Sequence, residues 1–473
     1  MKRKAKMLFF PLIIALFILG MVACVSLGAP HTQIREEGFV YNLRGNDSYA
    51  VVKYQGKDDV IVIPETVNGK YVTSIGRSAF SGCSGLTSIT IPDSVTSIGS
   101  DAFGACSNLQ YNEYDNGYYL GNNSHPYIVF VKVKNDGITS IDVADTTKII
   151  YQGAFSGCNR LTTINIPDSI ISIGSGAFNN CDNLKYNTYD NAKYLGNTNN
   201  PYFVLIAAIN KDSCTIHNNT KIICTNAFRE CYGLTSITIP DSVTSIGSEA
   251  FFGCFKLVEV YNKSSLNITK GSSNYGYVGY YAKDIYTAPY ASKFSTDSNG
   301  YILYTDEDVV SLIGYTGTDT ELTLPQGITE INQGAFCCCI GLTNITIPDS
   351  VTSIGNYAFF SCKGLTTITI PDKVTSIGEW AFCDCSRLTT ITIPDRVTSI
   401  GSCAFFDCSG LTSVTIGNSV TSIGNLAFSG CSILTSITYR GTEEQWNAIE
   451  KGFIWDTGTG DYIIYCLDGD NQK

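Results

Sequence analysis

Cysteine is the reactive residue that dominates this sequence, since its 473 residues include 19 cysteines and only three histidines. Eleven of the cysteines stand three residues after a phenylalanine, where a free cysteine can act as a small buried group with a weak hydrogen-bond donor. Equivalent cysteines of stacked repeats would point the same way, which is poor geometry for a disulfide. We therefore interpret this column as structural. Its members are Cys83, Cys106, Cys158, Cys181, Cys231, Cys254, Cys339, Cys362, Cys385, Cys408 and Cys431.

The remaining cysteines include one cluster that could do chemistry. Residues 337–339 are three consecutive cysteines and, with Cys383 and Cys403, could bind a metal ion or form a bridge. No histidine is near them and no CxxC pair occurs, so we expect no metal ion and no other cofactor. The histidines have no partner at metal-ligand or triad spacing; they are His31, His125 and His217.

Enzyme signatures are also missing from the sequence. There is no GxSxG, HExxH, P-loop or dinucleotide-binding motif. The segment Asp297-Ser298-Asn299-Gly300 resembles the start of a calcium loop, but the downstream glutamate is out of place and a turn is the better interpretation. We therefore predict a protein that is not an enzyme and has no catalytic residues.

A repeat sets the positions of these residues. Residues 342–433 contain four uninterrupted copies of a 23-residue unit, beginning LTNITIPDSVTSIGNYAFFSCKG. A fixed period of this length is typical of a solenoid, in which each coil buries its apolar residues against its neighbours. The frame occurs eleven times, each with an isoleucine five residues before a phenylalanine. These phenylalanines are Phe80, Phe103, Phe155, Phe178, Phe228, Phe251, Phe336, Phe359, Phe382, Phe405 and Phe428.

Within each coil, the segment LTSITIP predicts a short strand. Alternation points Ile89 and Ile91 into the coil. Ser88 and Thr90 then point outward, and the proline ends the strand because it cannot donate to a ladder. A later position, Gly99 in this coil, is glycine in eight of the eleven coils, which we interpret as a backbone with positive φ. Stacked coils should form continuous interior columns of Phe, Ile and Cys.

The pattern LxxIxIPxxVxxIxxxAFxxC covers roughly residues 58–438. It resembles the leucine-rich repeats of the BspA type, also called the Treponema pallidum type, of which the AFxxC ending is characteristic. The resemblance implies a β-rich, right-handed leucine-rich repeat solenoid with a curved parallel sheet on its concave side. It also implies a surface or secreted protein of a bacterium or protist, a class in which several members are adhesins.

Residues 1–23 predict an export signal. Four basic residues precede an apolar run over residues 7–22, which is shorter than the roughly 20 residues that a membrane-spanning helix needs. The run ends MVAC, which looks like a bacterial lipobox, so Cys24 is a candidate for lipidation after cleavage. Ordinary cleavage near Ala23 or Ala29 remains an alternative. We expect an exported protein, either lipid-anchored at the cell surface or secreted.

Loss of this leader would remove four cations and take the formal net charge from −11 to −15. An acidic chain without a basic block is a poor candidate for nucleic acid or an anionic membrane surface. We therefore expect an extracellular protein or glycan as the partner, no nucleic acid, and membrane contact only through the N-terminal lipid.

Insertions and caps complete the predicted organisation. Residues 24–57 should form a β-type cap or linker, and residues 58–438 the solenoid, interrupted near 109–137, 184–210 and 258–318. The first two insertions are copies of each other, each with two strands around an Asn-rich turn. They could project as hairpins or be built in as degenerate coils. The third is rich in Tyr, Ser and Asn and could hold a helical or loop element.

Residues 439–473 predict a C-terminal cap made of a helix and a strand. Thr442 and Gln445 form a capping box for a short helix through Glu450, with Gly452 placed to end it. Trp446 and Ile449 should pack over the last coil, and residues 462–466 should form a closing strand.

The outward strand positions make two hydroxyl-rich columns. Threonine suits a β surface and keeps it soluble, which is one interpretation of these columns. The other is a broad, neutral surface for a protein or glycan, since solenoids commonly bind partners there. The candidate residues are Ser236, Thr238, Asn344, Thr346, Thr367, Thr369, Thr390, Thr392, Ser413 and Thr415.

Tyrosines of the first two insertions are a second set of candidates. Tyrosine offers a large rigid contact area with a polar end, which interfaces favour. Packing of these rings against the edge of the solenoid is an equally good interpretation. The residues concerned are Tyr118, Tyr119, Tyr127, Tyr194 and Tyr202.

These features together favour a cell-surface leucine-rich-repeat binding protein, such as an adhesin, that interacts with extracellular protein or glycan. One alternative is a structural spacer or coat protein without a specific ligand. A third interpretation, binding to ice or another crystal surface, draws on the paired Ser/Thr columns, but the breaks between arrays argue against it.

Overall fold

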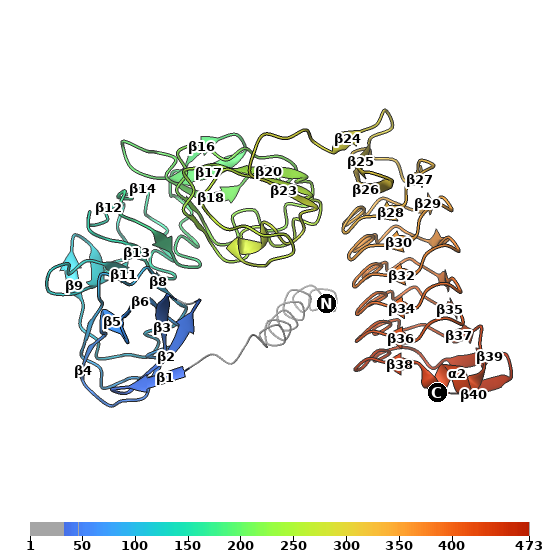
Figure 1. Ribbon diagram of the computed structural model, residues 1–473, viewed down its shortest axis with the longest axis horizontal. Coiled ribbons are helices and arrows are strands. Elements are labelled where there is room, and N and C mark those ends of the chain that lie inside the picture. Colours follow the sequence, from blue (N-terminus) through green and yellow to red (C-terminus); the bar gives the residue numbers. More distant parts are fainter. Residues whose placement is uncertain (1–32, 46, 473) are drawn as a thin grey trace. The chain divides into compact units, whose positions relative to one another are not determined.

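The computed structural model describes residues 33–45 and 47–472 (Figure 1). They form two compact units. Unit 1 ends at Lys185 and also takes in Gly196–Asn199, and unit 2 consists of Tyr186–Leu195 and Asn200–Lys473. Both are built from short strands. The described residues contain one α-helix, α2 (Glu443–Ala448), and one 3-10 turn, η1 (Tyr275–Tyr277).

Most coils contribute two strands, and each kind pairs in parallel with its equivalent in the next coil. The SITI segment forms what we call the long-strand ladder. In unit 1 its strands are β4 (Val60–Val62), β7 (Ser88–Thr90), β12 (Ser140–Asp142) and β14 (Thr163–Asn165). In unit 2 they are β20 (Ser236–Ile239), β22 (Glu259–Asn262), β23 (Asp284–Tyr286), β27 (Glu321–Thr323), β29 (Asn344–Thr346), β31 (Thr367–Ile368), β33 (Thr390–Ile393), β35 (Ser413–Ile416), β37 (Ser436–Tyr439) and β39 (Ile463–Cys466).

A second ladder, the short-strand ladder, forms from the VTSI segment, for which the sequence did not predict a strand. Its pairing advances by one coil, as in Ser376↔Ser399 and Ile377↔Ile400. In unit 1 its strands are β6 (Lys70–Ile75), β8 (Ser97–Ile98), β13 (Ile149–Ile150) and β15 (Ser172–Ile173). In unit 2 they are β19 (Ile222–Ile223), β21 (Ser245–Ile246), β28 (Glu330–Ile331), β30 (Ser353–Ile354), β32 (Ser376–Ile377), β34 (Ser399–Ile400), β36 (Ser422–Ile423) and β38 (Glu450–Lys451).

Four antiparallel three-stranded meanders divide the coils into four groups, which we call stacks. Each meander forms the start of one stack. The last strand of each meander joins the short-strand ladder in parallel, for example through Phe130↔Ile150 and Leu205↔Ile223. The first two insertions are therefore built in as the first coils of the stacks that follow them. The third first extends the preceding sheet with β22 and β23 and only then forms its meander. In unit 1 the strands are β1 (Gln33–Glu36), β2 (Phe39–Arg44), β3 (Ser48–Tyr54), β9 (Asn112–Tyr114), β10 (Gly117–Leu120) and β11 (Val129–Val133), and β5 (Thr66–Val67) pairs with β6. In unit 2 they are β16 (Asn187–Tyr189), β17 (Ala192–Leu195), β18 (Val204–Ala208), β24 (Phe294–Thr296), β25 (Tyr301–Asp306) and β26 (Val309–Tyr315).

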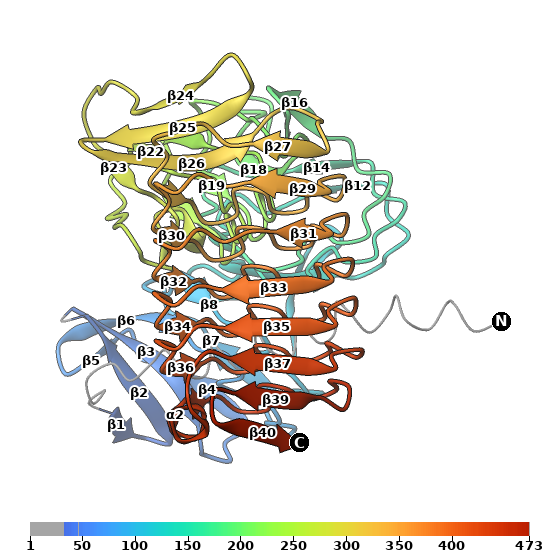
Figure 2. The ribbon, with the colours of Figure 1, turned by 90° about the vertical axis from the view of Figure 1, so that its right-hand side faces the viewer.

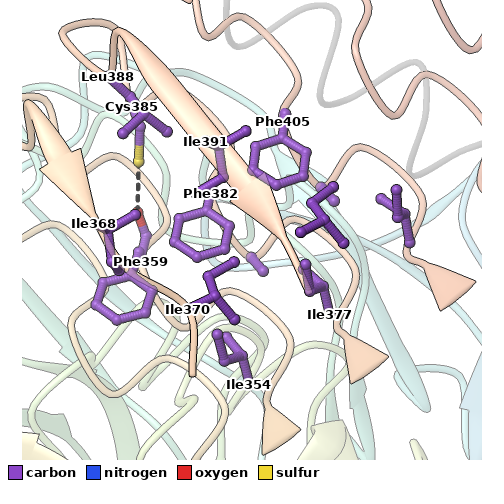
Figure 3. Packing of buried hydrophobic residues seen from close by; sticks show 14 of the residues in the cluster. Ile354, Phe359, Ile368, Ile370, Ile377, Phe382, Cys385, Leu388, Ile391 and Phe405 are labelled. Atoms are coloured by element: carbon purple, nitrogen blue, oxygen red, sulfur yellow. Dashed lines mark hydrogen bonds between the residues drawn. The ribbon is translucent and has the colours of Figure 1, made fainter. Parts of the chain in front are cut away.

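Stacked phenylalanine rings form the predicted interior spine (Figure 3). The rings of Phe359 and Phe382 lie 5.1 Å apart between centroids and within 5° of parallel. The stack continues to Phe405 and Phe428 with the same geometry, and Trp455 closes it edge-on at 6.1 Å. These four phenylalanines are fully buried, and each buried aromatic ring stabilises the fold by about 1.5–3 kcal/mol relative to exposure. The predicted stacking of phenylalanines is confirmed, but the rings form separate stacks rather than one continuous column.

The glycine column has a different cause from the one expected. A Cβ on Gly378 would lie 2.5 Å from the backbone nitrogen of Asn356 in the preceding coil, and Gly378 does not have a positive φ. Positive φ occurs instead two residues before and two after the phenylalanine, as at Trp380 and Asp384. The prediction of a left-handed backbone here was wrong; the glycine is needed because successive coils approach closely.

The C-terminal cap follows the prediction with three changes. Thr442 and Gln445 exchange both capping-box bonds, at 3.3 and 2.9 Å, and start α2. The helix ends before Ile449, and Glu450 already belongs to β38. Gly452 does not end the helix, since it occupies the glycine column, facing the nitrogen of Asn425. A final strand, β40 (Gly469–Gln472), adds an antiparallel edge that the sequence did not indicate.

Candidate binding surface

Strands β33, β35 and β37 of unit 2 lie side by side (Figure 2) and carry the predicted hydroxyl columns. Strands β33, β35 and β37 pair in register, with Thr390 beside Ser413 and Thr392 beside Thr415. The next strand continues both columns with Ser436 and Thr438. We call this surface the hydroxyl face, and its members are all exposed or half-exposed. They are Thr390, Thr392, Ser413, Thr415, Ser436 and Thr438.

An aromatic residue borders the hydroxyl face. Strand β39 pairs with β37 and places Ile463 beside Ser436 and Tyr465 beside Thr438. Tyr465 is 39% exposed, so its ring is accessible next to the hydroxyl column. The sequence predicts the closing strand but not this neighbour, because the residue pattern of the strand does not reveal which residues it pairs with.

The other predicted hydroxyl residues lie in two separate sheets. Asn344, Thr346 and Thr367 are exposed on β29 and β31, and Thr369 is exposed just after β31. Ser236 and Thr238 lie on β20, where the next strand places Glu259 and Tyr261 beside them. The predicted columns are therefore interrupted, although alternation placed their residues on the outer side correctly.

The interruption at β22 comes from the third insertion. The side chain of Glu259 is fully buried and accepts hydrogen bonds from the Ser292 hydroxyl at 2.9 Å and the Lys293 amide at 2.7 Å. The ring of Tyr261 meets Tyr290 edge-on at 5.6 Å. Residues of this insertion thus occupy the strand surface that hydroxyl groups occupy elsewhere.

A further threonine column, one residue before the hydroxyl face in each coil, has a structural role that the sequence did not reveal. The Thr412 hydroxyl donates to the Thr389 carbonyl at 3.0 Å, and the Thr435 hydroxyl donates to the Thr412 carbonyl at 3.0 Å. These hydroxyls tie each coil to the one before it. They leave the Ser and Thr side chains of the hydroxyl face as the groups that point to solvent.

Two of the five candidate tyrosines are not surface residues. Tyr119 and Tyr194 are fully buried, and their hydroxyls accept hydrogen bonds from the Ala144 and His217 amides at 3.3 and 3.2 Å. The expectation that they contact a ligand is corrected, because both rings hold a meander onto the following coil. Alternation within YYLG did not show which side of the hairpin is covered.

The other three tyrosines remain accessible. Tyr118, Tyr127 and Tyr202 are each half-buried. The Lys132 ammonium group lies 5.6 Å from the centre of the Tyr118 ring, in the range of a cation–π contact. These rings therefore combine packing on the meander with a partly open surface.

The column cysteines form a ladder of thiol hydrogen bonds. The Cys385 thiol donates to the Phe359 carbonyl at 3.2 Å (Figure 3), and the Cys408 thiol donates to the Phe382 carbonyl at 3.1 Å. Burial raises the pKa of Cys431 to about 12, so its thiol stays protonated and able to donate at neutral pH. The interpretation of this column as structural agrees with these contacts.

The three cysteines at residues 337–339 differ in their exposure to solvent. Cys337 is buried and Cys338 is exposed, with their sulfur atoms 3.6 Å apart. The hydrogen bond from Cys337 lowers the pKa of the Cys338 thiol. Among the residues that the structure describes, no group of three or more His, Cys, Asp or Glu side chains is arranged to hold a metal ion.

The remaining polar candidates have structural partners. His125 Nδ1 lies 2.8 Å from an Asp93 carboxylate oxygen, and His217 stacks on Tyr202 at 4.1 Å. Asp297 accepts hydrogen bonds from the amides of Asn299 and Tyr301, as expected of a turn. His31, the leader and Cys24 lie outside the described residues. No helix within the described range is both long enough and apolar enough to cross a bilayer.

Comparison with known proteins identifies the repeat. The family described as BspA type leucine rich repeat region (6 copies) matches residues 60–125, 129–199, 206–276 and 315–445. No curated protein matches the chain. A leucine rich cell surface protein from Faecalibacterium prausnitzii A2-165, of known structure, is 27% identical, with a TM-score of 0.40 over 89% of this chain and 98% of that one.

Two further solved structures show more distant similarity. A leucine-rich repeat protein from Bacteroides ovatus ATCC 8483 is 23% identical, with a TM-score of 0.27 over 91% of this chain and 99% of that one. The T. pallidum leucine rich repeat protein is 16% identical, with a TM-score of 0.19 over 76% and 91% of the two chains. Since the family match spans well over half of the sequence and coincides with the coils, the chain belongs to the BspA-type leucine-rich repeat family.

Proposed function

We propose that this protein acts outside the cell as a binding protein that holds an extracellular protein or glycan on its hydroxyl face. The observation that carries the proposal is the register of β33, β35 and β37. It places Ser and Thr side chains side by side at two outward positions of three consecutive strands. Each hydroxyl can both donate and accept a hydrogen bond, which suits a ligand rich in hydroxyl or amide groups.

The hydroxyl face is rigid and neutral. Strands β35 and β37 are paired on both sides and β33 is paired with β35, and the threonine ladder ties the coils together, so binding would order few side chains and lose little entropy. No ionisable side chain occurs among its six residues, although the whole chain carries a net charge of −11. A neutral ligand would therefore meet little local repulsion.

Aromatic residues supply further contact area in this proposal. Tyr465 lies beside Thr438 at the border of the hydroxyl face and is 39% exposed. Exposed tyrosines are frequent anchors in protein interfaces. The half-exposed Tyr118, Tyr127 and Tyr202 form additional candidate contacts on their own meanders.

The proposed location is the cell surface. The leader and Cys24 support export with a lipid anchor, and the similar F. prausnitzii protein is described as a cell surface protein. Adhesion is the role we favour, because a surface-held binding protein of this kind links the cell to the ligand that it holds.

The proposal can be tested by measuring binding to arrays of extracellular-matrix proteins, cell-surface proteins and glycans, using the chain without its leader. We expect saturable binding to at least one array component and at least a tenfold loss of affinity in the variant Thr392→Lys/Thr415→Lys, which places two cations on the hydroxyl face. The single variant Glu379→Lys is the matched control, since it makes the same change in net charge at an exposed residue of the preceding coil.

The outcomes separate binding from a purely structural role. Retained binding in Glu379→Lys together with lost binding in the double variant supports the hydroxyl face as the site. No saturable binding on any array would contradict the proposal and leave a spacer or coat role as the better interpretation. Equal loss in both variants would show that net charge rather than the hydroxyl face controls binding.

A further inference from the structure

Strand β4 is the unprotected edge of the first long-strand sheet. It pairs with β7 on one side, through Val60↔Ser88, Ile61↔Ile89 and Val62↔Thr90. In the described part of the chain no strand pairs with its other side. Figure 1 shows β4 at the margin of unit 1. An edge strand of this kind offers unpaired backbone groups to another strand.

The backbone contacts show which groups face the open edge. The Asp59 carbonyl accepts hydrogen bonds from the Thr87 and Ser88 amides, and the Ile63 amide donates to the Thr90 carbonyl at 3.2 Å. Successive residues of a strand direct their backbone groups to opposite edges. The amide and carbonyl groups of Val60 and Val62 therefore point away from β7.

The side chains of β4 make this edge unusual. Val60 and Val62 are 61% and 63% exposed, whereas Ile61 and Ile63 are buried. Other coils carry mainly Ser, Thr or Asn at the two outward positions. Of the four later strands that begin long-strand sheets, β12 and β27 carry an exposed charge, at Asp142 and Glu321, whereas β20 and β33 carry Ser and Thr, so β4 alone is apolar at both outward positions. Charged residues are the usual protection of an edge against pairing, and β4 lacks one.

We propose that β4 is a self-association edge, at which it pairs antiparallel with β4 of a second copy of this chain around a twofold axis at Ile61. In this register Val60 faces Val62 of the second copy, and both residues direct their backbone groups toward each other. The pairing would form four hydrogen bonds and bring the exposed valines of the two copies together. Twofold symmetry, which uses the same surface on both copies, is the commonest arrangement in homo-oligomers.

The flanking charges favour a second copy over an unrelated strand. Lys57 and Glu65 are both exposed and lie four residues before and after Ile61. Antiparallel pairing around Ile61 therefore sets each lysine opposite a glutamate of the other copy. Asp58 and Asp59 would face Pro64 and Ile63 of the second copy, so no two carboxylates are opposed. Pro64 cannot donate a hydrogen bond and ends the pairing, which makes the contact short and the expected dimer weak.

The proposal can be tested by sedimentation velocity, which measures the oligomeric state of the chain without its leader from micromolar to millimolar concentration. We expect a monomer that becomes a dimer as concentration rises. The variant Val60→Lys/Val62→Lys should weaken the dimer at least tenfold, because four lysines would meet at the contact. The control Asn344→Lys/Thr346→Lys makes the same substitutions at exposed positions of β29, which is paired on both sides, and should dimerise as the natural chain does.

Hydrogen exchange gives a second readout that does not depend on any variant. Amides in a peptide spanning residues 57–65 should exchange rapidly in dilute solution and become protected as the dimer forms. A chain that stays monomeric at millimolar concentration overturns the proposal. Dimerisation of the variant Val60→Lys/Val62→Lys with unchanged affinity would also overturn it. Protection of residues 57–65 at every concentration would overturn it as well, because another part of the same chain would then cover β4. The hydroxyl-face binding assay is unaffected by any of these results.

Discussion

At the scale of single residues, the cysteine column joins neighbouring coils as well as filling space. Seven of the eleven column thiols donate to the carbonyl of a phenylalanine in the coil before them, as Cys362, Cys385 and Cys408 do at 3.1–3.2 Å. The same carbonyl also accepts the backbone amide three residues after the phenylalanine, as the Phe359 carbonyl does from Cys362 at 3.1 Å, so the thiol adds a second hydrogen bond from the next coil to a buried acceptor. Serine or alanine at the same position would change this bond in different ways.

We expect Cys385→Ala to lower the free energy of unfolding by about 1–3 kcal/mol, because the Phe359 carbonyl keeps only the Cys362 amide as a donor and the missing sulfur atom leaves a small cavity in the interior. Cys385→Ser keeps a donor at the same place and should cost less than alanine. Urea unfolding monitored by circular dichroism measures both. Ser386→Ala, at the half-exposed neighbouring position, is the control and should change stability by no more than about 0.5 kcal/mol. A larger loss for serine than for alanine would show that the column acts by apolar packing alone.

At the scale of elements, the sequence predicts long strands better than short ones. The alternation of Ser88, Ile89 and Thr90 identified β7 and its outward residues, because three or more residues are enough to show a period of two. The short strands, such as Ser376–Ile377 in β32, contain two residues and cannot show any period. Only the stacking of equivalent segments from successive coils makes them into a ladder.

The same limit applies to the candidate surface. Alternation placed the Ser and Thr residues outward, but the burial of Tyr119 and Tyr194 depends on which coil covers their hairpin. The pairing of Tyr465 with Thr438 depends on the register of the cap. Both are tertiary features, and neither leaves a signal in the local pattern of residues.

The glycine column gives a prediction at this scale. Gly378→Ala should lower the free energy of unfolding by about 1–3 kcal/mol, because the new Cβ would press on the Asn356 nitrogen at 2.5 Å and the coils must move apart. Gly341→Ala is the matched control in the same stack, since a Cβ there meets nothing within 4 Å and its φ is not positive. Thermal and urea unfolding compare the two. Equal effects would mean that backbone freedom, rather than close approach, explains the column.

At the scale of the whole molecule, stability is distributed over local contacts between neighbouring coils. The Phe155 ring stacks on Phe130 and Phe178 within unit 1, and Phe382 stacks on Phe359 and Phe405 within unit 2. Phe178 ends its stack half-exposed, whereas Trp455 covers the end of the other. In repeat architectures each coil gains most of its stability from its immediate neighbours, so a defect should spread only along its own stack.

Phe382→Ala tests this directly, since it should cost about 3–5 kcal/mol by opening a cavity in the spine. Hydrogen exchange measured by mass spectrometry should become faster in coils from Phe359 to Phe428 and remain unchanged in unit 1. The reciprocal variant Phe155→Ala should accelerate exchange around residues 130–178 and leave the coils near Phe382 as they were. Faster exchange in both units after either substitution would show that the chain unfolds as one cooperative body. A purely local response would mean that the hydroxyl face on β33, β35 and β37 keeps its geometry whatever happens in unit 1.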